Sequence, residues 1–228
     1  MKIATLALVI GVCIAPAQFL PNLQARTPEE FDAYLDVTEA QAESQIRTAR
    51  RFLTAYPESE LRLRVYELLA DACRRQGDAT GASEAARQGL KVAPDYIPLL
   101  TTLGSIEANT SPSPDRAPAD RALRLLETAK APAHVEAETW LRENARLRAE
   151  NLASLGIGAF KRDRRDEAIG FLEASVKLSA QPANQFRLAM LYLDAGQRAK
   201  ARVLLEQVAR SGEAALRTRA ETALKRLP

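Results

Sequence analysis

Hydrophobic positions recur at helical spacing along most of the chain. Two such stretches lie in "LRVYELLADACRRQGDATGASEAARQGLKVAPDY" at 63–96, where Gly77-Asp78 separates them. Apolar residues three and four positions apart predict amphipathic helices that each bury one face. No segment alternates apolar and polar residues as a half-buried strand does. The pattern therefore predicts an all-α protein of short, antiparallel helix pairs.

The helix pair repeats with a period near 34 residues, because 149–182 and 182–215 reproduce the offsets of 63–96. Each copy has a small residue in the first helix that faces an alanine in the second, so that the two helices pack closely. In two copies a glycine after the first helix, Gly77 or Gly196, supplies the positive φ that ends it. The pattern comprises Tyr66, Leu69, Ala70, Gly77, Ala82 and Pro94; Leu103 and Gly104; Leu155, Gly156 and Ala168; and Leu188, Ala189, Tyr192, Gly196 and Ala201.

These positions resemble those of the tetratricopeptide repeat (TPR) family, with the closest matches in "YELLADACRRQGD" and "LASLGIGAFKRDRRDEAIGFLEASVKL". The resemblance implies TPR-type helix-turn-helix units stacked as an α-solenoid. A polar amphipathic segment at about 212–227 is suited to be a C-terminal capping helix. We expect one repeat domain over 26–228, with repeats at about 28–60, 63–96, 97–136, 149–182 and 182–215.

Two segments of the array depart from the regular repeat. Prolines and serines predict an exposed loop insertion at 108–119 in the third repeat. The apolar spacing after it predicts that the first helix of the 149–182 repeat is extended by about three turns, with Trp140 near its start.

Gly156-Ile157-Gly158, followed by Lys161, superficially resembles a phosphate-binding loop. A dinucleotide-binding loop needs a third glycine at 161 and a preceding strand, and the chain has no Gly-Lys-Ser/Thr of a P-loop. We therefore expect Gly156 to be a packing glycine within a helix, and we expect no cofactor.

The N-terminal segment has the features of a signal peptide at 1–17: basic Lys2, an apolar run at 3–15 and small residues before the cleavage site. Cleavage is expected after Ala17, or alternatively after Ala25. Lipidation of Cys13 is an alternative, although a small residue is expected before a lipidated cysteine. We expect export to the periplasm or envelope, with membrane contact if Cys13 is lipidated or the signal stays uncleaved.

Charge changes sign along the chain, although the total is +3, too small to indicate nucleic-acid binding. Residues 26–60 carry eight acids and four bases, a net −4, whereas 195–228 carry eight bases and three acids, a net +5. This gradient could orient a partner or favour head-to-tail contact. Solvated helix faces of different sign are the simpler interpretation.

Candidate catalytic residues are sparse. The single histidine, His134, lacks triad or metal-binding companions, and Cys73 falls on an apolar helix face. The acid pairs Glu29-Glu30 and Asp166-Glu167 sit at helix starts, where carboxylates favour the helix dipole. We therefore expect a non-enzymatic protein with no metal and no small-molecule substrate.

The TPR resemblance also implies a concave groove that holds a peptide or helix of another protein. Its charged N-terminal part would be formed by Arg64, Glu67, Asp71, Arg74 and Arg75, and its apolar C-terminal part by Ile157, Phe160, Phe186, Met190 and Leu193. Exposed apolar residues of this kind mark an interaction site. The alternatives are that the C-terminal segment, the long helix or a second copy of the chain covers the apolar part.

Short motifs such as the Tyr-Pro-x-Ser at 56–59 resemble repeats of bacterial envelope proteins. The groove lacks the Lys and Asn pattern of TPR proteins that clamp C-terminal carboxylates. The resulting hypothesis is an envelope scaffold that binds another protein. The alternative is a structural or oligomeric subunit whose apolar groove end is buried by self-association or by an obligate partner.

Overall fold

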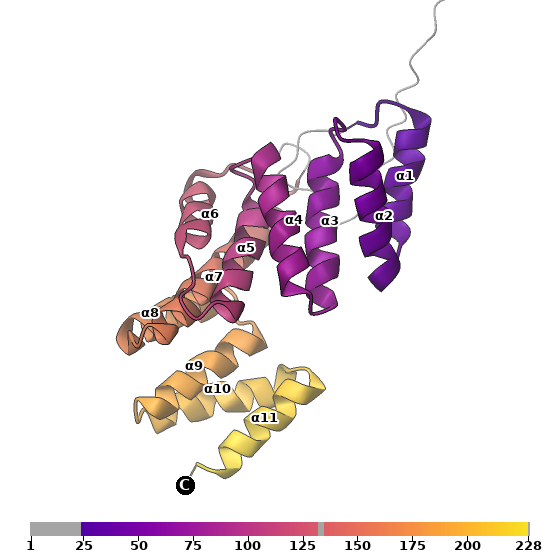
Figure 1. Cartoon of the computed structure of the whole chain (residues 1–228). Helices are drawn as coiled ribbons and strands as arrows, with labels where there is room; N and C mark the ends of the chain where they lie inside the picture. The colour runs from indigo at the N-terminus through magenta and orange to yellow at the C-terminus, as the bar shows by residue number, and fades with distance from the viewer. Residues whose placement is uncertain (1–23, 132–134, 228) are drawn as a thin grey trace, which may run out of the picture.

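The structure is a computed structural model that describes residues 24–131 and 135–227. Its described part contains helices and no strands (Figure 1). The helices are α1 (Pro28–Glu39), α2 (Ala42–Ala55), α3 (Arg62–Arg75), α4 (Ala79–Val92), α5 (Ile97–Thr110), α6 (Ala117–Thr128), α7 (Ala137–Lys161), α8 (Arg165–Leu178), α9 (Pro182–Asp194), α10 (Arg198–Ser211) and α11 (Ala214–Lys225).

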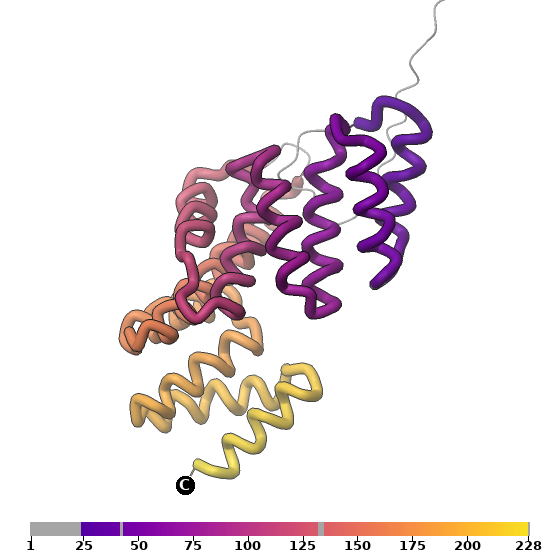
Figure 2. The backbone as a smooth tube through the Cα atoms, viewed as in Figure 1, coloured from indigo at the N-terminus to yellow at the C-terminus, as the bar shows by residue number. Residues whose placement is uncertain are grey.

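Each helix packs against the next one along the chain, and the odd-numbered helices also contact one another in series from α1 to α11, except that α7 and α9 are bridged by α8. The backbone trace shows α1 to α4 side by side, a change of direction through α5 to α8, and α9 to α11 beneath them (Figure 2). The predicted all-α solenoid is confirmed.

Close packing within the helix pairs depends on small residues. A Cβ on Gly156 would lie 3.0 Å from Leu172 Cγ and 3.3 Å from the carbonyl oxygen of Ala168. Any residue other than glycine would place a Cβ in these short contacts, and a close-packed interior leaves little room to relieve them. Gly156 is therefore a packing glycine inside α7, as the sequence predicts.

The turn after the first helix has the same conformation in three helix pairs. Gly77 and Gly196 have φ of 75° and 73°, and Asp163 takes the equivalent left-handed position with φ of 57°. In each turn the next N–H donates to the carbonyl five residues earlier: Asp78 to Cys73 at 2.9 Å, Arg164 to Ala159 at 3.0 Å and Gln197 to Tyr192 at 2.7 Å. These bonds satisfy carbonyls at the helix end.

Two glycines in the C-terminal half should respond in opposite directions to alanine. Gly196→Ala is expected to lower the free energy of unfolding by about 1 kcal/mol, because alanine is strained at positive φ. Gly170→Ala is expected to raise it by about 0.5–1 kcal/mol, because Gly170 lies inside α8 and a Cβ there would meet nothing within 4 Å. Urea denaturation followed by circular dichroism would measure both. Equal shifts would contradict this interpretation of the turn.

Helix α7 is 25 residues long and contacts α5, α6 and α8, as expected for an extended first helix. The α5–α6 connection covers 111–116, shorter than the expected 108–119, because α5 continues to Thr110 and α6 begins at Ala117. The expected exposure of this loop is wrong in part, since Pro114 is buried. Lys161 Nζ donates to the carbonyl oxygen of Ser111 at 2.8 Å, and Arg162 Nη1 to that of Pro114 at 3.1 Å.

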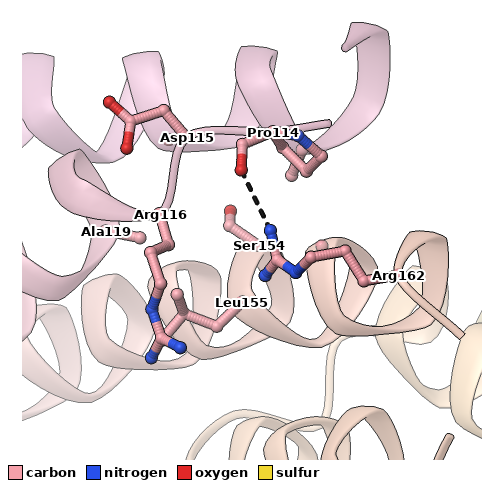
Figure 3. A pocket seen from close by; sticks show the side chains of 10 residues that line it. Pro114, Asp115, Arg116, Ala119, Ser154, Leu155 and Arg162 are labelled. Carbon is pink, nitrogen blue, oxygen red and sulfur yellow. Dashed lines mark hydrogen bonds between the residues drawn. The ribbon is translucent and has the colours of Figure 1, made fainter. Parts of the chain in front are cut away.

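A small cavity of about 10 Å³ remains where this connection meets α7 (Figure 3). Leu155, Ser154 and the Arg162–Pro114 hydrogen bond border it. Such a volume holds about one water molecule. The cavity is a packing defect at the junction and has no room for a ligand.

The buried side chains form three clusters that follow one another along the solenoid. The first extends from α1 to α5 and includes Phe52 and Leu99, and the last extends from α7 to α11 and includes Leu172 and Leu205. A smaller cluster with Leu147 joins α5, α6 and α7. Within the described part of the chain, no helix combines the length and hydrophobicity that crossing a membrane requires.

Candidate functional site

The expected N-terminal part of the groove contains a partly buried ion pair. Arg64 Nη1 lies 2.6 Å from Glu67 Oε1, and their side chains are 12% and 20% exposed. The hydroxyl of Tyr96, just before α5, donates to Glu67 Oε2 at 2.5 Å. Tyr34 of α1 also interacts with Arg64. The network therefore links α1, α3 and the start of α5.

The electrostatics of this network favour neutral tyrosines beside the ion pair. Burial, reinforced by the negative charge of Glu67, raises the pKa of Tyr96 far above its usual value. Burial also raises the pKa of Tyr34, although the Arg64 charge opposes the shift. Tyr96 is thus held as a hydrogen-bond donor to the carboxylate at all ordinary pH values.

The other three expected residues, at the C-terminal end of α3, pair with one another. Asp71 accepts from Arg74 at 2.6 Å and also from Arg75. Arg75 additionally donates to Gln45 Oε1 at 2.5 Å, which connects α3 to α2. The structure thus brings these charges together in local pairs, and exposed pairs of this kind add little stability.

The expected apolar part of the groove is divided by α11. Phe160 and Met190 are 45% and 38% exposed, and Ile157 and Leu193 are half-buried. Phe186, expected to be exposed, is only 7% exposed. The guanidinium of Arg219 on α11 lies 4.7 Å from the centre of the Phe186 ring. The C-terminal segment therefore covers part of the expected apolar surface, one of the alternatives open from the sequence.

A hollow of about 260 Å³ lies between the ends of α9 and α11, hereafter the C-terminal hollow. Sequence reasoning found two of its lining residues, Met190 and Leu193. It missed the others because they come from helices outside the groove pattern. Their signal was the apolar i, i+4 spacing of Ala223, in α11, and Leu227, just after it. The full lining is Met190, Leu193, Arg198, Ala223, Arg226 and Leu227.

The residue types that commonly bind metal ions are dispersed in the described part of the chain. No three His, Cys, Asp or Glu side chains in this part of the chain are placed to hold a metal ion. Cys73 is fully buried, as expected for a core residue, and burial raises the pKa of its thiol. His134 and the expected signal peptide lie outside the described residues.

Comparisons with known proteins show likeness in fold. No family model matches the sequence, and no curated protein matches it. The thermophilic TPR protein TTC0263 of Thermus thermophilus is 19% identical, with a TM-score of 0.57, over 86% of this chain and 99% of that one. PilW, described as a type IV pilus biogenesis factor, is 16% identical, with a TM-score of 0.58, over 87% and 93%.

A further match comes from the anaphase-promoting-complex (APC/C) hetero-tetramer Cut9-Hcn1. The matched chain of that complex is 20% identical to this one, with a TM-score of 0.64, over 86% of this chain and 34% of the matched chain. At these identities the matches show the fold alone. The chain therefore has a TPR-type α-solenoid fold, and the resemblance seen in the sequence is confirmed at that level.

Proposed function

We propose that the chain is a non-enzymatic scaffold that binds a peptide or helix of another protein along its concave face. Solenoids of stacked helix pairs present extended concave surfaces suited to this role. The observation that carries the proposal is the apolar surface left exposed toward the C-terminal end: Met190 is exposed and lines the C-terminal hollow, and Phe160 is exposed near the end of α7. Methionine and aromatic side chains suit adaptable contact with an apolar anchor.

The proposal includes a location in the bacterial envelope, outside the cytoplasm. Two observations support it: the signal-peptide pattern at 1–17 and the fold shared with PilW, itself described as a pilus biogenesis factor. Fractionation of cells that express the full chain would test this location. Recovery of the chain in the cytoplasmic fraction would contradict it.

Site-specific photocrosslinking would test the binding surface. A photoreactive phenylalanine at Met190 in the full chain is expected to crosslink to another protein in cells. The same group at Val203 of α10, which is 54% exposed, is the matched control and is expected to give no such product. Equal products at both positions would contradict binding at this surface.

The alternative, a structural or oligomeric subunit, predicts a different crosslinked product. A dimer of the chain at Met190, together with a dimer mass in light scattering that Met190→Glu converts to a monomer mass, would establish self-association. Met190 suits this test better than Phe186, because a charge at buried Phe186 would disturb the core.

A further inference from the structure

Three cations from different helices are connected through shared neighbours, Asn109 of α5 and Phe186 of α9. They are Lys161 at the end of α7, Arg187 on α9 and Arg219 on α11, and we refer to them as the cation cluster. None of the three forms an ion pair with an acid among residues 24–131 and 135–227. Their partners are neutral groups and an aromatic ring.

Arg187 is held in place by amide oxygens. Its Nη1 donates to Asn184 Oδ1 at 3.0 Å, and its Nη2 reaches Asn109 Oδ1 at 3.5 Å. Asn109 is fixed in turn, because its own Nδ2 donates to the Ser105 carbonyl at 2.7 Å. Arg187 therefore reaches from α9 to the end of α5, and its position is set before any ligand arrives.

Lys161 and Arg219 are each connected to Arg187 by separate contacts. Lys161 Nζ donates to the main-chain oxygens of Asn109 and Ser111 at 3.2 and 2.8 Å, at the C-terminal end of α5. Arg219 stacks over Phe186, the residue that precedes Arg187. Asn109 thus joins Lys161 to Arg187, and the 186–187 dipeptide joins Arg187 to Arg219.

The charge of Arg187 is not compensated by an ion pair within the described part of the chain. Burial, and then the neighbouring charge of Arg219, lower the pKa of Arg187. On α9 itself the nearest downstream acid, Asp194, lies seven residues away, about 10 Å along the helix. Arg187 is half-buried, whereas Lys161 and Arg219 are exposed. A half-buried charge beside a like charge costs free energy unless an anion compensates it. A guanidinium presents paired N–H donors that match a carboxylate.

We infer that the cation cluster binds a side-chain carboxylate from an acidic segment of the partner protein. The inference rests on the proposed function, since it concerns the same partner protein. Met190, exposed and three residues from Arg187 on α9, lies on the same side of the helix. The recognised segment therefore carries an acidic residue close to an apolar one, with the apolar side chain directed toward Met190 and the C-terminal hollow.

Fluorescence anisotropy with two defined peptides tests this inference on the full chain. The first is a fluorescein-labelled dodecapeptide of leucine and glutamate, and the second has glutamine at every glutamate. Wild type is compared with Arg187→Gln/Arg219→Gln. The matched control is Arg210→Gln/Arg217→Gln, which removes two exposed arginines that form no ion pair within the described residues. Circular dichroism confirms that each variant is folded.

We expect wild type and the control to prefer the glutamate peptide about tenfold, and the Arg187/Arg219 variant to lose that preference. Equal binding of both peptides by wild type would overturn the inference and leave groove binding in place. A preference for the glutamate peptide that persists in the Arg187/Arg219 variant would also overturn the inference, since the overall charge of the protein would then explain the preference.

If neither peptide binds wild type, the proposed groove function fails with this probe, and the cation cluster is tested directly. The thermal midpoint is measured in sodium tricarballylate and in sodium chloride of equal ionic strength. A rise in tricarballylate that is larger for wild type and the control than for the Arg187/Arg219 variant supports the anion site. Equal rises in all three proteins overturn it.

Discussion

Replacement of Glu67 by alanine is expected to lower the free energy of unfolding by about 3 kcal/mol. The change leaves the charge of Arg64 without its partner, and the Arg64 side chain is only 12% exposed. It also removes the acceptor of the Tyr96 hydroxyl. The expected loss lies at the lower end of the range for breaking a buried ion pair, because the Glu67 side chain is partly exposed to water. Urea denaturation of the full chain at neutral pH measures the effect.

Asp71→Ala is the matched control, because Asp71 lies on the same helix and also pairs with arginines. Its ion pairs are more exposed, so we expect a loss of about 0.5 kcal/mol. The triple variant Arg64→Met/Glu67→Leu/Tyr96→Phe replaces the ion pair and the Tyr96 hydroxyl by apolar groups and should recover much of the stability lost by Glu67→Ala. Equal losses for Glu67→Ala and Asp71→Ala would show that the network is not a structural link.

Valine at Gly156 is expected to cost about 2–3 kcal/mol through overpacking at the α7–α8 contact. Its Cβ would lie 3.0 Å from Leu172 Cγ and 3.3 Å from Phe171 Cβ, and its two methyl groups would need further space. Leu172 is 2% exposed and has little freedom to move. The free energy of unfolding from urea denaturation is again the measurement.

Gly170→Val provides the control for helix propensity, since a Cβ at Gly170 of α8 meets nothing within 4 Å. We expect it to be close to neutral. Leu172→Ala should partly relieve the Gly156→Val clash, so the double variant should lose less stability than the two single losses combined. Strict additivity would mean that the introduced valine and Leu172 do not compete for the same space.

Local features of the sequence were sufficient to predict the helix pairs. Close helix packing, as at Gly156, and a left-handed turn, as at Gly77, each require a particular residue type at one position. Both features can therefore be recognised directly in the sequence. The connection at 111–116 was harder, because its prolines suggested exposure. Its partial burial depends on Arg162, 48 residues after Pro114. Contacts at such separation have no local signal.

The candidate surface was predictable in outline from the sequence. The structure differs from the expected groove for geometric reasons. The groove positions assume that each first helix leaves its concave stripe open. Helix α11 instead lies over α9 and covers Phe186, while Arg64 and Glu67 are drawn into a network by Tyr96, 29 residues from Glu67. The cation cluster takes its three members from α7, α9 and α11, so only the contribution of Arg219 to the basic C-terminal segment was visible in the sequence.

The length of α7 has a consequence for how the solenoid can flex. Repeats that contact only their neighbours distribute bending over their whole length. Here α7 packs on α5, α6 and α8 at once, and Lys161 and Arg162 fasten its end to the 109–114 segment. The middle of the molecule is therefore its stiffest part. The concave face can widen or narrow mainly by movement of α1–α4 on one side of this block and of α9–α11 on the other.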